Sequence, residues 1–311
     1  MRLVTFTLGN TPPRAGALLE GDRKLLDLQA AYSRVYHGSS PLLESVLAMV
    51  DGGAEALDVA DSLIRGYSEA TTHDRADVRL LAPIPCPPQM RDFLCFEKHL
   101  LQAFQAIGKK PPQAWYERPL FYHPNRFSVC GPDAEVPWPS YTESLDYELE
   151  FGCYIGIPGK DIAREKAREH IFGYTIFNDF SARDAQRIEM EGRLGPAKGK
   201  SFDGGNVMGP WIVTPDEIGD PYRLKMEARV NGQLRSQGIS DGMLFSFEEI
   251  IAHVSKDETL MPGEFIGSVT VGNGCGLELG WYLEHGDTIE LEVEKIGVLR
   301  NRVERQDAKA A

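Results

Sequence analysis

Apolar and acidic residues alternate regularly along residues 145–157. Side chains two apart on a strand point to the same side, about 6.5–7 Å from each other, so the pattern predicts a strand with one apolar and one acidic face. The acidic face has two interpretations: a solvated sheet face, or carboxylates that converge on a hard divalent cation. The alternation alone favours the solvated face. The apolar positions are Leu145, Tyr147, Leu149 and Phe151, and the acidic ones are Asp146, Glu148 and Glu150.

The first 80 residues combine short alternating runs with helical patterns, which predicts a small α+β domain. They contain no cluster of reactive side chains, so we expect this domain to be structural or to supply one wall of a site. The expected strands are residues 2–8, 15–19 and 24–27, and the expected helices are residues 41–50 and 54–67.

Prolines at positions 83, 85, 87 and 88 enforce an extended backbone, and we place a domain boundary at residue 81. The following part, residues 81–305, is rich in short strands and poor in helices. Asn231-Gly232 predicts a two-residue hairpin, and residues 306–311 form a polar tail that we expect to fray. The chain is therefore predicted to be α+β and mostly β. Expected strands are residues 91–96, 173–180, 211–214, 266–271 and 289–293, and expected helices are residues 97–107, 162–170 and 246–254.

The formal charge of −13 argues against binding to nucleic acid or to an anionic membrane, since both require basic patches. Five scattered cysteines without a C-x-x-C pair indicate reduced thiols, neither a disulfide framework nor a zinc site. The N-terminal residues lack an apolar signal core, and no run approaches the roughly 18 apolar residues of a membrane span. We therefore expect a soluble, cytoplasmic protein.

Several polar groups stand at the ends of predicted elements. Asp92 and His99 are seven residues apart at a strand–helix junction, and residues 178–186 place several polar groups after an apolar run. Lys200 lies in a glycine-rich loop that lacks the spacing of a phosphate-binding loop. We interpret Arg183 as a partner in a structural ion pair. Each signal alone is weak, because turns and surfaces use the same residue types.

Taken in order, the motifs resemble the fumarylacetoacetate hydrolase family over residues 88–303. They are Leu-Asp-Tyr-Glu-Leu-Glu, Gly-Tyr-Thr-Ile-Phe-Asn-Asp-Phe-Ser-Ala-Arg-Asp-Ala-Gln, Gly-Lys-Ser-Phe-Asp, Gly-Pro-Trp-Ile-Val-Thr and Pro-Gly-Glu-Phe-Ile. The resemblance implies a small, variable N-terminal domain, a larger mixed β-sandwich or roll around the active site, and a homodimer.

The resemblance also implies a role for each matching residue. Glu148, Glu150 and Asp179 would bind a divalent cation, most often Mg²⁺ and otherwise Mn²⁺ or Ca²⁺, with Asp92 as a fourth ligand. His99 would be the general base, oriented by Glu278, because Gln102 stands where shorter members carry a glutamate. The resemblance further implies that Lys200 and Gln186 stabilise negative charge and that Tyr122 and Thr270 hold substrate oxygens.

These roles imply an enzyme that acts on a small oxo or diketo acid. The leading hypothesis is a hydrolase that cleaves a carbon–carbon bond in a diketo acid or β-diketone, with a water activated by His99 and a carbonyl polarised by the metal. The alternative is an isomerase, tautomerase or decarboxylase of an enolisable 2-oxo acid on the same metal site. A non-catalytic ligand-binding protein ranks last, because every residue that the chemistry needs is present.

Overall fold

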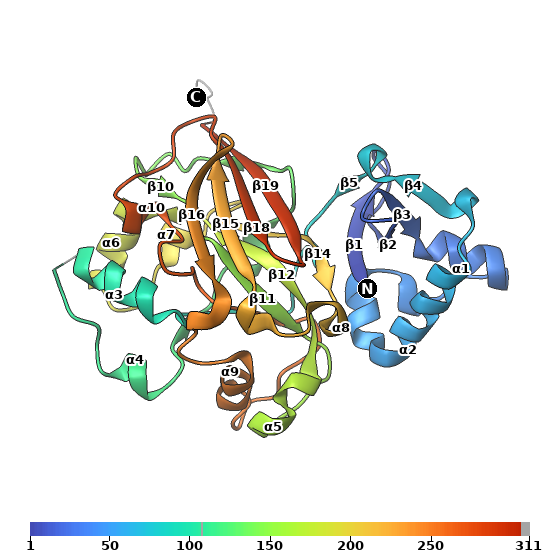
Figure 1. Ribbon diagram of the computed structural model, residues 1–311, viewed down its shortest axis with the longest axis horizontal. Helices are drawn as coiled ribbons and strands as arrows, with labels where there is room; N and C mark the ends of the chain where they lie inside the picture. Colours follow the sequence, from blue (N-terminus) through green and yellow to red (C-terminus); the bar gives the residue numbers. More distant parts are fainter. Residues whose placement is uncertain (107, 306–311) are drawn as a thin grey trace.

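The computed structural model describes residues 1–106 and 108–305, and its central feature is a 12-stranded sheet. β5 (Arg79–Leu80) pairs with its strand β1 (Arg2–Thr7), and β8 (Val129–Cys130) pairs with its strand β14 (Asn206–Val213). Strands from the first 80 residues thus share a sheet with strands from the rest of the chain (Figure 1). The remaining order is β4 (Thr72–Asp74), β3 (Lys24–Asp27), β2 (Arg14–Leu19), β1 (Arg2–Thr7), β14 (Asn206–Val213), β12 (Ile171–Asp179), β11 (Glu150–Ile155), β17 (Phe265–Gly267), β6 (Met90–Phe93) and β7 (Phe121–Tyr122).

A five-stranded sheet packs against the strands of the larger part of the chain. Its strands alternate buried and more exposed positions, as expected of a sheet with one face in the core. Met226 and Leu291 on its inner face join Phe151 and Tyr174 of the large sheet in one hydrophobic cluster. The order of its strands is β16 (Gln233–Ile239), β15 (Lys225–Val230), β18 (Thr288–Val293), β19 (Gly297–Glu304) and β9 (Glu135–Pro137).

Two helices of the N-terminal part, α1 (Leu28–Tyr36) and α2 (Val46–Arg65), cover the sheet at one end of the molecule (Figure 1). Leu3 points into the cluster that includes Val46 and Met49, while the next residue, Val4, points into the other cluster. The two faces of β1 therefore belong to different cores. The Ser45 hydroxyl caps α2 by accepting from the amide of Ala48.

Short helices connect the strands elsewhere. The α-helices are α3 (Glu97–Ala106), α4 (Ala114–Glu117), α5 (Arg164–Ala167), α6 (Arg183–Glu191), α7 (Ala197–Lys200), α8 (Pro215–Ile218), α9 (Phe247–Val254) and α10 (Gly276–Leu279). The 3₁₀ helices are Pro41–Leu43, Glu69–Thr71, Arg75–Asp77, Arg126–Ser128, Arg168–His170, Pro221–Arg223 and Ser240–Gly242. α9 begins at a complete capping box formed by Ser246 and Glu249.

The single strand expected over residues 145–157 is wrong, because the chain forms two short strands there. β10 (Leu145–Asp146) pairs with β13 (Ser181–Ala182), and β11 resumes at Glu150. Between them, the amide of Glu148 donates to the Asn178 side chain at 3.0 Å, and that of Leu149 donates to the carbonyl of Gly274 at 3.0 Å. These contacts replace a regular ladder. Asp146, Glu148 and Glu150 are also buried, so the solvated-face interpretation is wrong too.

Most other expected elements are present with shifted ends. The helix expected over residues 41–50 corresponds to the 3₁₀ helix Pro41–Leu43 and the start of α2. The helix expected over residues 54–67 corresponds to the rest of α2, whose backbone is non-helical at Gly53. The hairpin at Asn231-Gly232 joins β15 and β16. β19 was not anticipated. The domain boundary at residue 81 stays a prediction, and the expected frayed tail, residues 306–311, lies outside the described residues.

The fold class is confirmed: it is the mixed α+β architecture of large sheets with a small N-terminal α+β region. The cysteines Cys86, Cys95, Cys130, Cys153 and Cys275 are free, in keeping with the prediction of reduced thiols. Among residues 1–106 and 108–305, none of the helices combines the length and apolar composition needed to span a bilayer.

Gly152, on the central strand β11, offers a test of the sheet packing. A methyl group there would overlap the Phe265 ring and the carbonyl oxygen of Ile266. We expect Gly152→Ala to destabilise the protein by about 1–3 kcal/mol, as overpacking does in closely packed cores, measured by urea or thermal unfolding. Gly38→Ala is the control, because the nearest neighbouring atom would lie 4.0 Å away in an exposed position. Equal stability of the two variants would contradict this packing.

Candidate active site

Three buried carboxylates, those of Asp92, Glu150 and Asp179, converge at one end of neighbouring strands. One oxygen of each lies within 4.8 Å of the others. The sheet brings them together: Asp92 is opposite Gly267, Gly267 is opposite Gly152, and Glu150 lies two residues from Gly152 on the same face. A side chain at Gly267 would overlap the Asp92 carboxylate, so glycine at this position leaves room for that group.

Four oxygens of this acidic cluster have no hydrogen-bond partner among the described residues: Oδ2 of Asp92, both carboxylate oxygens of Glu150, and Oδ1 of Asp179. Buried polar atoms are normally paired, and an unpaired buried charge is costly. Carboxylate oxygens are the ligands that Mg²⁺, Mn²⁺ and Ca²⁺ prefer. The donor set therefore fits a hard divalent cation.

The other oxygens of the acidic cluster are held by neighbouring groups. Oδ1 of Asp92 accepts from the amide of Val269 at 3.1 Å, and Oδ2 of Asp179 accepts from the Tyr122 hydroxyl. Lys200 Nζ lies 2.6 Å from the same Asp179 oxygen. These contacts fix the two aspartates with one oxygen each toward the cluster centre.

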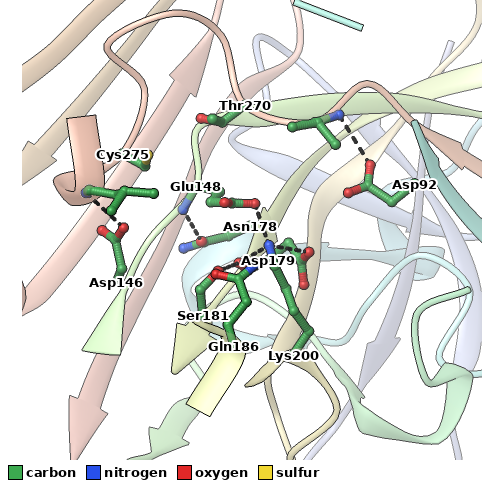
Figure 2. Close-up of polar contacts among 12 residues, drawn as sticks. Asp92, Asp146, Glu148, Asn178, Asp179, Ser181, Gln186, Lys200, Thr270 and Cys275 are labelled. Carbon is green, nitrogen blue, oxygen red and sulfur yellow. Dashed lines mark hydrogen bonds and ion pairs between the residues drawn. The ribbon is translucent and has the colours of Figure 1, made fainter. Parts of the chain in front are cut away.

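Glu148 is adjacent to the acidic cluster, but one of its oxygens is bound to Lys200 (Figure 2) and the other to Arg183. Lys200 Nζ lies 2.6 Å from Oε2, and Arg183 donates to Oε1 at 2.8 Å. Burial alone would raise the pKa of Glu148, but Lys200 and Arg183 outweigh it and the net shift is downward. Burial would lower the pKa of Lys200, yet Asp179 and Glu148 raise it on balance.

The pKa values of the acidic-cluster carboxyls shift upward, opposite to that of Glu148. Burial, together with the negative charges of their neighbours, raises the pKa of Asp92 and of Glu150 well above the ordinary carboxylate range. Burial also raises the pKa of Asp179, to about 6, with Lys200 opposing the shift. The carboxyls of the acidic cluster therefore hold protons more readily than exposed acids do, whereas Glu148 favours its ionised form.

His99 on α3 faces Glu278 on α10, with Nδ1 3.2 Å from Oε1. Both side chains are almost fully buried. Glu278 is held in place from the other side, because Oε2 accepts from the amide of Cys275 at 3.2 Å. Cys275 in turn forms a β-bridge with Glu148, so this His–Glu pair adjoins the segment that carries the acidic residues.

Asp146 connects the two halves of the site, a role that the sequence did not indicate. Its carboxylate accepts from the amides of Gly276 and Leu277, at 2.7 and 3.0 Å, at the start of the helix that carries Glu278. It also accepts from Nε of Arg183 at 2.7 Å. The only signal in the sequence was its place in the acidic row. Arg183 forms the ion pairs that we expected of it.

The remaining candidates lie around the acidic cluster. Gln186 on α6 accepts from Arg183 at 2.9 Å. Tyr122 is engaged with Asp179, and burial followed by the charges of Asp179 and Asp92 raises the pKa of its hydroxyl well above the usual value. Thr270 is fully buried, and its hydroxyl is bound to the backbone of Leu149 at 3.0 and 3.2 Å. In this structure Thr270 therefore braces the acidic segment.

Gln102 makes a further contact, with Asn273, that the sequence did not indicate. Its side-chain amide donates to Asn273 Oδ1 at 2.6 Å and accepts from the Asn273 amide at 3.3 Å. The two bonds fasten α3 to the loop that leads into α10. They hold the two helices of the His–Glu pair together.

Comparison with known proteins places this site in a family. The family described as "Fumarylacetoacetate (FAA) hydrolase C-terminal" matches residues 89–304. Oxaloacetate tautomerase YisK of Bacillus subtilis is 33% identical over 293 residues, which are 92% of this chain and 95% of that protein. Oxaloacetate tautomerase fahd2, mitochondrial, of Xenopus laevis is 31% identical over 309 residues, 97% of this chain and 90% of that protein.

A solved structure shares the fold along the whole chain. The fumarylacetoacetate hydrolase of Exiguobacterium antarcticum aligns with a TM-score of 0.75 and 29% identity, covering 98% of this chain and 100% of that one. Sequence motifs, fold and comparisons agree. This chain belongs to the fumarylacetoacetate hydrolase family.

Proposed function

We propose that this enzyme is a divalent-cation-dependent tautomerase that interconverts the keto and enol forms of a 2-oxo dicarboxylic acid, with oxaloacetate as the first substrate to test. One structural observation carries the proposal: a buried His99–Glu278 pair adjoins three carboxylates whose free oxygens suit a hard cation. Both curated relatives described above are named oxaloacetate tautomerases and span more than nine-tenths of the chain.

Asp92, Glu150 and Asp179 would hold the cation, with Glu148 beside them. The bound cation would supply Lewis acidity, which polarises the substrate carbonyl and lowers the cost of negative charge on its oxygen. Mg²⁺ and Mn²⁺ are the first ions to test, because both favour oxygen ligands.

The protein's own groups move the proton. His99 Nδ1 faces Glu278, which leaves Nε2 to take a proton from the carbon next to the carbonyl. Glu278 fixes the tautomer of the imidazole and stabilises the imidazolium that forms. Lys200 and Gln186 supply positive charge and an amide near the oxygen on which negative charge develops. No attacking water takes part.

Hydrolysis of a carbon–carbon bond in a diketo acid is the second candidate, favoured by the likeness to the Exiguobacterium antarcticum hydrolase. It uses the same enolate chemistry and adds a water for His99 to deprotonate. The homodimer and the cytoplasmic location stay predictions from the sequence.

The fate of the substrate's carbon skeleton separates the two reactions. We expect the enzyme with Mg²⁺ to accelerate loss of the enol absorbance of oxaloacetate while all four carbons stay in one molecule. In ¹⁸O-labelled water, acylpyruvates should give no cleaved product with a labelled carboxylate. Labelled cleavage products at a rate matching enol loss would favour the hydrolase.

Substitution in the His–Glu pair tests the proton transfer. We expect His99→Gln to lower kcat about 100-fold or more, in the range that general acid–base groups contribute. Glu278→Gln should cost less and shift the pH profile of kcat, because it alters how the imidazole is held. Both variants should keep their affinity for Mn²⁺, measured by electron paramagnetic resonance of the free ion. His253→Gln on α9 is the control, and full activity of His99→Gln would refute the assignment.

Cation affinity should depend on pH in a defined direction. Because burial raises the pKa of Asp92, Glu150 and Asp179, protons compete with Mn²⁺ for these carboxyls, so affinity should rise with pH, roughly tenfold per unit for each proton displaced. Below a pH of about 6, Asp179 also takes up a proton and the slope should steepen. Mn²⁺ titrations between pH 5 and pH 8 check this. Asp179→Asn should lose the extra steepness, and a pH-independent affinity would contradict the prediction.

A further inference from the structure

His99, Cys275 and Glu278 form a second group of possible metal ligands, the His–Cys–Glu cluster. One ligand atom of each lies within 4.8 Å of the others. The Cys275 thiol is 3.4 Å from Glu278 Oε2, on the carboxylate whose other oxygen faces His99 Nδ1 at 3.2 Å. All three side chains are more than nine-tenths buried.

Within the part of the chain that the structure describes, two atoms of the His–Cys–Glu cluster lack a hydrogen bond of good geometry: Nδ1 of His99 and Oε1 of Glu278. The two atoms lie 3.2 Å apart, but their geometry does not meet that of a hydrogen bond. With the imidazole proton on Nε2, Nδ1 of His99 and Oε1 of Glu278 offer lone pairs beside a thiol, which is the donor set that a tetrahedral metal ion binds. The poor geometry of the hydrogen bond between these two buried atoms points to a ligand independently of the cysteine.

The chemistry of the His–Cys–Glu cluster differs from that of the acidic cluster. The acidic cluster offers oxygen only and suits Mg²⁺ or Mn²⁺, whereas nitrogen, sulfur and one carboxylate oxygen suit Zn²⁺, which binds imidazole and thiolate more tightly than hard cations do. Excess Mg²⁺ would thus not protect this cluster from Zn²⁺.

We propose that the His–Cys–Glu cluster is a Zn²⁺ site, separate from the acidic cluster, and that Zn²⁺ bound there inhibits the enzyme. Binding replaces the thiol proton of Cys275, which leaves to solvent. It also takes the Glu278 carboxylate and Nδ1 of His99, whose proton moves to Nε2, so the imidazole can no longer accept a proton from the substrate. The inhibitory half rests on the proposed function, whereas the binding half does not.

The surroundings allow a metal ion to enter. His99 lies on α3, a ten-residue helix at the edge of the molecule whose outer positions Glu97, Lys98 and Leu101 are exposed (Figure 1). Local opening of α3, which requires breaking the Gln102–Asn273 bonds, would uncover the cluster.

Cobalt(II) serves as the probe, because a cobalt–thiolate bond gives an intense near-ultraviolet charge-transfer band that oxygen ligands do not give. With the enzyme saturated with Mg²⁺, we expect one equivalent of Co²⁺ to produce this band and Zn²⁺ to abolish it by displacement. Cys275→Ser should lose the band, and Cys86→Ser, the control, should keep it. Co²⁺ binding without the band, or a band that survives in Cys275→Ser, would overturn the site.

Serine also caps helices, so Cys275→Ser should keep α10 intact, which its thermal unfolding checks. His99→Gln provides a second variant that leaves the thiol in place. It should weaken Co²⁺ binding at this site at least tenfold while Mn²⁺ binding at the acidic cluster stays the same. Equal Co²⁺ affinity in His99→Gln and the wild type would exclude the imidazole as a ligand.

Activity tests the inhibitory half. With excess Mg²⁺, we expect micromolar Zn²⁺ to inhibit tautomerisation by the wild-type enzyme, and Cys275→Ser to need at least tenfold more Zn²⁺ for the same fractional loss. A cobalt–thiolate band without inhibition by Zn²⁺ would overturn the inhibitory half and count against proton transfer by His99. Absence of the band with unaltered tautomerase activity would overturn the site alone.

Discussion

The constraint on which this structure depends is the burial of more acids than bases in one place. Asp146 and Glu148 are neutralised by Arg183 and Lys200, and Lys200 also reaches Asp179. Asp92 and Glu150 have no such partner within the described chain, and unpaired buried charge is among the most costly features of a protein interior. Either protons or a divalent cation must balance them, so the state of this site changes with pH and metal.

The interruption between β10 and β11 distributes the acidic row among different partners. In one unbroken strand the three acids would line one face, close together and repelling each other. In the structure Asp146 caps α10 and binds Arg183. Glu148 binds the side chains of Lys200 and Arg183, and the oxygens of Glu150 belong to the acidic cluster. A regular sequence pattern thus becomes three separate electrostatic environments.

The parts of the fold that could be predicted from the sequence are those set by local patterns and by contacts between near neighbours in the chain. Alternation and turn residues located β1, β2, β3 and the β15–β16 hairpin, because those strands pair with near neighbours in sequence. The family motifs identified the members of the acidic cluster. What could not be predicted were the contacts across long stretches of chain: Asp146 with Gly276, Thr270 with Leu149, and Gln102 with Asn273. The periodicity of a sequence does not indicate which distant residues will pair. Each of these contacts fixes the position of a residue in or beside the site.

Enolate chemistry is common to tautomerisation and to carbon–carbon hydrolysis, so the metal ligands alone do not separate them. The difference is whether a water can stand between the base and the carbonyl. Here the His99 side chain is 7% exposed and that of Glu278 is 0% exposed, held between α3 and α10. The enclosure orients the imidazole equally well for either reaction, because a bound carbon acid and a water both need room beside Nε2. Tautomerisation ranks first because the relatives that match more than nine-tenths of the chain are named oxaloacetate tautomerases.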